Sequence, residues 1–229
     1  MPVSKSVSKF RSLSKQQCLD VYPSIRLNAA KHFHAAKLLA ANLDFGNGIA
    51  HLILGTEEQV KAAVLMLQAY DFPVRDIKNY DKLFYLHAAR HNVLKEFHSI
   101  FVFADSVMKY RAVRQRTKGG DNFAKMFMDG LLAVKDGLEN YQWWDSADKL
   151  KQNCFYLDYT DEGMIDPARI GVLQWETTFK FITKVTHDLQ ELTETIVGAS
   201  GKELAEFRQQ FIDGEIGDLM AESIVRKRV

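Results

Sequence analysis

Cysteine, proline and long apolar runs are all scarce in this 229-residue sequence, which contains two cysteines and four prolines. Cys18 and Cys154 are too few and too far apart to indicate a disulfide framework, which favours a reducing compartment, and we expect a cytoplasmic protein. No segment approaches the roughly 20 apolar residues of a spanning helix, so no membrane association is expected. The net charge of +1 gives no global basic field of the kind that attracts nucleic acid.

The usual sequence motifs of metal and covalent catalysis are also missing. The chain has no HExxH, no Glu-x-x-His, no CxxC, no GxSxG and no phosphate-binding glycine loop. His87 and His91 do have the i, i+4 spacing of two ligands on one helical face. Without an accompanying carboxylate motif this pair is a weak metal signal, and we expect neither a metal nor another cofactor.

Few prolines and apolar residues at helical spacing predict a mainly α protein, an antiparallel helical bundle. Residues 1–22 are expected to form an N-terminal segment, rich in Ser and Lys, whose short helix opens with a capping box at Ser14 and Gln17. Residues 23–120 would form the helical core, and 121–229 a C-terminal helical part packed on it as one domain. The expected helices cover 24–42, 49–70, 80–116, a segment from 121 or 122 after the hinge TKGGDN, 172–197, 202–212 and 216–226.

An aromatic, extended segment at 154–167 interrupts the helical pattern. The run CFYLDY, followed by the turn TDEG, predicts a short strand or hairpin. A flexible linker would be polar and rich in Gly and Ser. We therefore expect this segment to be ordered and packed on the helical body, burying Phe155, Tyr156, Leu157 and Tyr159.

The helix expected over 49–70 is apolar on nearly every side, which is typical of a central, buried helix. One side of this helix forms a core stripe, and the opposite side is almost equally apolar. The two carboxylates that the helix carries therefore need an explanation. Glu57 precedes Lys61 by four residues and is predicted to form a local surface pair with it. Glu58 points into the second apolar side and needs a partner, since burying an unpaired carboxylate is costly.

A candidate partner set lies on the next helix, in LHAARHNVLKEFH. His87, His91 and His98 fall on one apolar face, which Arg90 borders. We predict a buried, charge-assisted cluster of Glu58 with Arg90 or a protonated histidine. His87, Arg90, His91 and Glu58 are then the candidate catalytic residues.

Several of these segments together resemble AbiV-type abortive-infection proteins of the HEPN superfamily. The matching features are Asn28-Ala29 on the first helix, Glu57-Glu58-x-x-Lys61 on the second, the basic, histidine-containing helix after them, and the aromatic-x-Asp, glycine and proline pattern of Tyr156, Asp158, Gly163 and Pro167. They extend over roughly residues 13–191. The resemblance implies a HEPN-like bundle with extra C-terminal helices. The candidate binding residues are Asn28, Glu57 and Lys61 from these motifs, together with His98 on the histidine face and His32.

The resemblance also implies a function. It indicates a bacterial anti-phage effector that arrests host growth, by inhibiting translation or attacking RNA, once a phage protein activates it. A metal-independent ribonuclease using His87, Arg90 and His91, or Arg26 and His32, is one alternative, because RNA cleavage needs a base and a cation near the phosphate. A non-catalytic dimerisation or adaptor protein is another. We also expect a homodimer that buries one apolar face of the central helices, because the second helix has more apolar perimeter than a small bundle readily covers.

Overall fold

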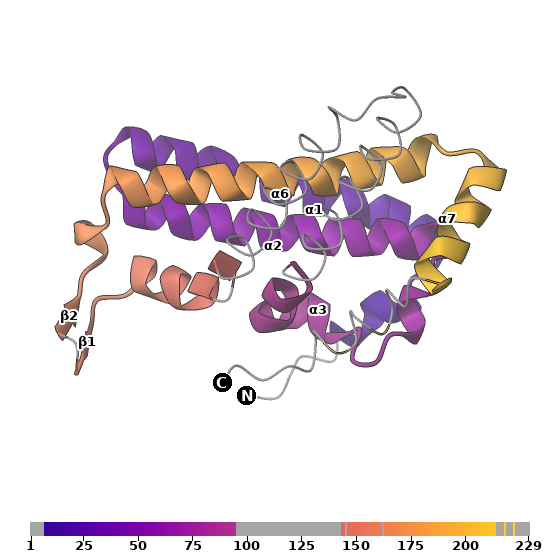
Figure 1. Cartoon of the computed structure of the whole chain (residues 1–229), viewed down its shortest axis with the longest axis horizontal. Helices are drawn as coiled ribbons and strands as arrows, with labels where there is room; N and C mark the ends of the chain where they lie inside the picture. Colours follow the sequence, from indigo (N-terminus) through magenta and orange to yellow (C-terminus); the bar gives the residue numbers. More distant parts are fainter. Residues whose placement is uncertain are drawn as a thin grey trace, which may run out of the picture.

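The computed structural model describes residues 7–94, 143–144, 146–161 and 163–213, with single positions at 218 and 222. Three helices lie side by side along its longest dimension: α1 (Lys15–Ala41), α2 (Phe45–Ala69) and α6 (Val172–Gly198) (Figure 1). The smaller elements are η1 (Val7–Ser12), η2 (Pro73–Asp76), α3 (Lys82–Tyr85), β1 (Asp158–Thr160), β2 (Gly163–Ile165), η3 (Pro167–Arg169) and α7 (Gly201–Asp213). Residues 87–94 and 146–155 are also helical. The predicted class, mainly α with one short hairpin, is confirmed.

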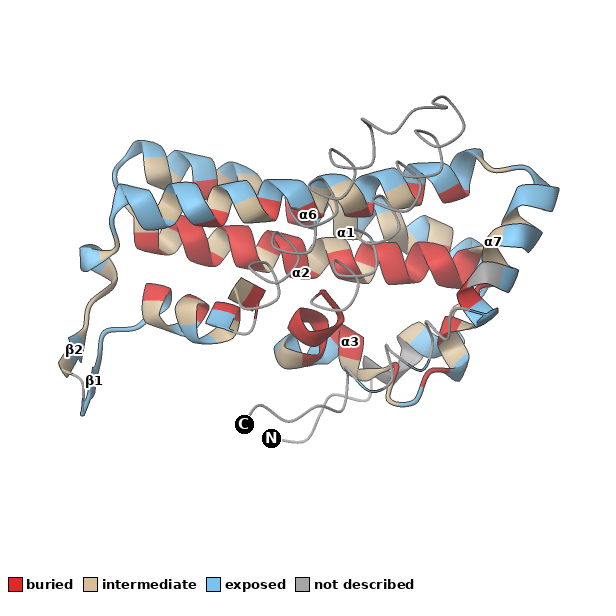
Figure 2. Cartoon of the chain, viewed as in Figure 1, coloured by how far each residue is buried: buried red, intermediate tan, exposed pale blue. Residues whose placement is uncertain are grey.

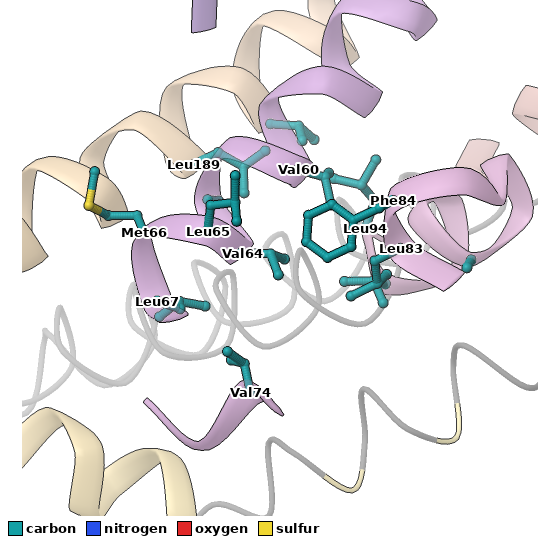
Figure 3. Packing of buried hydrophobic residues seen from close by; sticks show 14 of the residues in the cluster. Val60, Val64, Leu65, Met66, Leu67, Val74, Leu83, Phe84, Leu94 and Leu189 are labelled. Atoms are coloured by element: carbon teal, nitrogen blue, oxygen red, sulfur yellow. The ribbon is translucent and has the colours of Figure 1, made fainter. Parts of the chain in front are cut away.

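Helix α2 is the central element, as its apolar perimeter predicted. It packs against α1, α6, η2 and η3, and Figure 2 shows it buried over most of its length. The predicted core stripe is confirmed, since all its members are less than 5% exposed: Leu52, Ile53, Val60, Ala63, Val64 and Leu67. Around Val60 and Val64 the cluster includes Leu94 and Leu189, which come from other helices (Figure 3). The single chain therefore covers most of α2. Exposed apolar surface on this helix is no longer a reason to expect a homodimer, which stays a prediction.

Helix α1 begins earlier than predicted. The capping box is present, because Gln17 N–H donates to Ser14 Oγ at 3.2 Å and Ser14 N–H donates to Gln17 Oε1 at 2.8 Å. The helix then continues through Pro23 instead of restarting after it. Proline removes one backbone hydrogen bond from a helix interior. Val21 and Tyr22 pack against the core, and their burial offsets that loss.

Close packing at glycines holds α2 in place. A Cβ at Gly55 would lie 2.7 Å from the Phe33 ring of α1, so only glycine allows this approach. At Gly46 it would lie 2.8 Å from the Pro167 carbonyl oxygen, and at Gly48 3.0 Å from the Trp175 ring. Asp44 caps the helix by accepting from Asn47 N–H at 3.3 Å. These contacts explain why α2 starts at Phe45, four residues before the predicted start.

The helix predicted over 80–116 is broken. Leu86 has extended backbone angles, φ −106° and ψ 113°, between α3 and the helical run 87–94. In a continuous helix the Leu83 carbonyl would accept from the amide of His87. Here it accepts from Arg90 Nη1 at 3.1 Å. The remainder of that helix, with His98, the hinge TKGGDN, the helix expected after it and most of 216–226 lie outside the described residues.

The hairpin forms where the sequence predicted it, but its apolar side chains are not buried. Strands β1 and β2 pair in antiparallel fashion, with Tyr159 opposite Met164. Phe155, Tyr156, Leu157 and Tyr159 are 37%, 61%, 69% and 80% exposed, so the prediction that they pack on the body is wrong. The hairpin extends from one end of the bundle (Figure 1), and only Phe155 at its base is seen against a helix, edge-on to the His51 ring in the described structure.

Candidate functional site

Glu57, on the middle of α2, is the centre of the site. Its side chain is 1% exposed, and both carboxylate oxygens accept hydrogen bonds from two other helical segments. Oε1 accepts from His91 Nε2 and from Lys151 Nζ, each at 2.8 Å. Oε2 accepts from Arg90 Nη2 at 2.9 Å and from His87 Nδ1. We call Glu57, His87, Arg90, His91 and Lys151 the Glu57 cluster.

The environment of Glu57 keeps it ionised. Burial alone would raise the pKa of its carboxyl, but the hydrogen bonds from His87 and His91 and the positive charge of Arg90 outweigh burial and hold the pKa far below its ordinary value. Burial lowers the pKa of His91, against the opposing effect of Glu57. His91 is therefore a neutral donor through Nε2, and the balancing charges on Glu57 come from Arg90 and Lys151.

His87 is the member of the cluster that reaches the surface. Its side chain is 50% exposed, whereas those of Arg90, His91 and Lys151 are at most 5% exposed. Nδ1 donates to Glu57 and also lies 2.8 Å from Arg90 Nη2, and in the described part of the chain no hydrogen bond reaches Nε2. A carboxylate that fixes one imidazole nitrogen and leaves the other accessible is the arrangement of a histidine that transfers protons.

The prediction for the two glutamates was wrong, because their roles are exchanged. Glu58 pairs with Lys61 at 2.5 Å on the half-buried side of α2, and Glu57 holds the histidines and Arg90. The apolar pattern of α2 could not indicate on which side the 87–94 segment packs. Since both sides of α2 are apolar in the sequence, either glutamate could have met it.

Three predicted cluster members are brought together, namely His87, Arg90 and His91. Of the predicted binding residues, Asn28 is exposed on α1, away from these contacts, and His98 lies outside the described residues. His32 Nδ1 lies 3.0 Å from His51 Nδ1, and burial lowers the pKa of both rings. His32 thus belongs to a separate histidine pair between α1 and α2.

The Arg26–His32 alternative is not supported by the geometry. Residues six apart on a helix point in different directions. The Arg26 guanidinium lies over the Tyr22 ring at 5.8 Å, and His32 contacts His51. The two side chains do not form a common site.

Lys151 is the member of the site that the sequence reasoning missed. Trp144, Ala147, Lys151 and Cys154 are all buried, at spacings of three, four and three residues. A lysine at a core position of an amphipathic pattern needs a carboxylate partner. A lysine at a position where the helical pattern is otherwise apolar was the signal in the sequence that could have identified Lys151.

Metal and membrane features are not found in the part of the chain that the structure describes. No group of three or more His, Cys, Asp or Glu side chains there is arranged to hold a metal ion. None of the helices in those ranges combines the length and the apolar character that crossing a membrane requires.

Comparison with known proteins gives one family. The HEPN_AbiV family model, described as AbiV, matches residues 17–191, which include every described member of the Glu57 cluster. No curated protein and no solved structure matches the chain. The matched region covers most of the sequence and agrees with the helical fold. The chain therefore belongs to the AbiV family of HEPN proteins, a family of abortive-infection and phage-resistance proteins.

Proposed function

We propose that this protein arrests host growth by inhibiting translation after a phage component activates it, and that the Glu57 cluster is its working site. Family membership supports the abortive-infection role. The observation that carries the site is the buried Glu57 carboxylate that holds His87, a half-exposed histidine, by its Nδ1 atom.

A second candidate, metal-independent RNA cleavage, is favoured by the same geometry. His87 Nε2 would take the proton of a ribose 2′-hydroxyl, and O2′ would bond to the adjacent phosphorus while the P–O5′ bond breaks. The proton would then pass from His87 to the departing O5′, leaving a cyclic phosphate and a free 5′-hydroxyl. Arg90 is buried and pairs with Glu57. It therefore positions Glu57 and His87 and does not contact the phosphate.

The test compares two exposed histidines. His87→Ala should abolish growth arrest and phage protection, with little change in thermal stability because the ring is half exposed. His187→Ala is the matched control, since His187 is 67% exposed on α6 and pairs only with Glu191 at 3.7 Å in the described structure. Incorporation of labelled amino acids after phage infection measures translation. Full arrest by the His87→Ala protein would refute the proposed site.

Incubation of the purified protein with total RNA separates the two mechanisms. Cleavage that disappears in His87→Ala and leaves cyclic phosphate ends supports the ribonuclease. Arrested translation with intact RNA supports a non-cleaving effector. If neither wild-type expression nor infection stops growth, the adaptor alternative replaces both.

A further inference from the structure

The end of the bundle that carries the hairpin is unusually apolar. Most of the exposed large apolar side chains in the described residues are on the hairpin or on the helix ends beside it: Leu38, Leu43, Phe155, Tyr156, Leu157, Tyr159, Met164, Val172 and Leu173. We call this set the end patch. Exposed apolar side chains gathered at one end of a folded protein are a common mark of an interaction site.

Contacts between the elements hold the patch together. The start of α2 packs on η3, because Gly46 lies against the carbonyl oxygens of Pro167 and Cys154. Gly48 lies against Trp175, near the start of α6. The hairpin leaves this corner in Figure 1, and Phe155 at its base rests edge-on against the His51 ring. The helix ends and the base of the hairpin therefore form one packed corner, from which the two strands extend.

The hairpin presents both an apolar face and open strand edges. Tyr159 is directly opposite Met164, and they are 80% and 42% exposed. The sheet has only two strands in the described structure, so each strand has one outer edge that no other strand pairs with. A two-stranded ribbon is marginally stable in water, and a third strand improves it. An extended segment from another protein can supply that strand.

Charge decides which occupant fits. Residues 155–166 contain four acidic residues and no basic residue. Asp166 pairs with Arg169 at 3.8 Å, whereas Asp158 and Asp161 are exposed, with no ion pair in the described structure. Acidic side chains repel the phosphates of nucleic acid and of anionic lipid. A second copy docked by the same patch would place like charges face to face, which is unfavourable.

We propose that the end patch binds an extended segment of a partner protein in which apolar residues alternate with lysine or arginine, added as a third strand to the hairpin. The apolar side chains would cover Tyr159 and Met164, and the basic ones would pair with Asp158 and Asp161. This surface does not include the Glu57 cluster, so the proposal stands apart from the function proposed above.

The probe is a short fluorescent peptide in which valine and lysine alternate, tested against the full chain by anisotropy. A peptide with glutamate in place of each lysine is the control. We expect the lysine peptide to bind about tenfold more tightly than the glutamate peptide, because charge complementarity sets the choice of partner. Added salt should narrow that difference.

Three variants locate the binding. Tyr159→Ser should weaken binding of the lysine peptide about tenfold, as loss of an aromatic anchor does. Leu27→Ser is the matched control, because Leu27 is 58% exposed on α1, outside the patch, and should leave binding unchanged. Asp158→Lys should reduce the preference for the lysine peptide. All three positions are exposed, so the variants should fold.

Several results would overturn the proposal. These are no binding of the lysine peptide, equal binding of the two peptides, and binding that Tyr159→Ser leaves intact. Light scattering adds another, since self-association lost in Tyr159→Ser would make the patch an interface between copies. Binding of an RNA oligonucleotide that requires Tyr159 would make it a nucleic-acid surface.

Discussion

Glu57 and Gln68 lie about three turns apart on the same buried helix, and each connects segments that are distant in sequence. Gln68 Nε2 contacts the carbonyl oxygens of Phe10 and Leu13 at 3.0 and 3.1 Å, and its Oε1 accepts from Tyr80 at 2.6 Å. These amide, carbonyl and hydroxyl groups are neutral, although the Leu13 carbonyl also accepts from Arg75 Nη2 at 2.6 Å, and Gln68 and Tyr80 are buried. The Glu57 cluster is charged and reaches the surface through a half-exposed histidine. The neutral network is suited to holding the N-terminal segment, and the charged one to chemistry.

The largest effect should come from removing the buried charge. Glu57→Ala leaves Arg90 buried without its carboxylate and leaves Lys151 with its longer pair to Asp148 at 3.4 Å. Breaking a buried ion pair costs about 3–5 kcal/mol of the free energy of unfolding. Urea unfolding followed by circular dichroism measures this loss. A stability equal to wild type would mean that Glu57 does not connect the three helical segments.

A smaller loss is expected at the neutral network. Gln68→Leu removes the hydrogen bonds of Gln68 to the Phe10 and Leu13 carbonyls and to the Tyr80 hydroxyl. The two carbonyls keep another donor, Leu13 N–H and Arg75 Nη2 respectively, whereas the buried Tyr80 hydroxyl loses its partner, and an unsatisfied buried group costs about 1–3 kcal/mol. The damage should centre on η1, so hydrogen exchange should rise there before it rises in α6. Uniform exchange throughout the chain would contradict this local role.

The two networks should lose stability in opposite pH ranges, the Glu57 cluster in acid and the Gln68 network in alkali. Burial lowers the pKa of His91 from its ordinary value of 6.5, so the unfolded chain takes up a proton that the folded chain does not. That stability is present above pH 6.5 and declines as the pH falls below it. Burial raises the pKa of Tyr80 above its ordinary value of 10.0, so its contribution declines as the pH rises past 10.0.

Thermal unfolding between pH 4 and 11 tests both directions. The acid decline should shrink in His91→Gln, and the alkaline decline should shrink in Tyr80→Phe. An acid decline that is unchanged in His91→Gln would assign it to other groups, such as His32 and His51, whose pKa values burial also lowers.

The smallest loss of stability is expected at Glu58, the neighbour of Glu57 in the sequence. Glu58→Ala removes only the pair with Lys61, and such a pair on a helix surface contributes about 0.2–0.5 kcal/mol. Comparing it with Glu57→Ala in the same urea series tests the exchanged roles of the two glutamates directly. A loss at Glu58 as large as that at Glu57 would restore the sequence-based assignment.

Periodicity in the sequence was enough to predict α2 as the central helix and to identify its core stripe. It also placed the hairpin, because aromatic residues followed by an acidic glycine turn are a local signal. The choice between Glu57 and Glu58 was not local. It depended on where residues 87–94 and Lys151 pack, and nothing along α2 records that. The exposure of Tyr159 was missed for a related reason, since apolar character indicates a need for cover without showing what supplies it.

The close approach of Phe33 to Gly55 has a consequence for comparing sequences. The two helices touch here with no side chain on α2 between them, and the His32–His51 contact lies one turn away. Any larger residue at position 55 therefore requires the Phe33 ring to move, by a change of its own rotamer or by a shift of α1. A sequence of this type that carries alanine or valine at this position should therefore differ as well at the position of Phe33, and the two positions are best compared together.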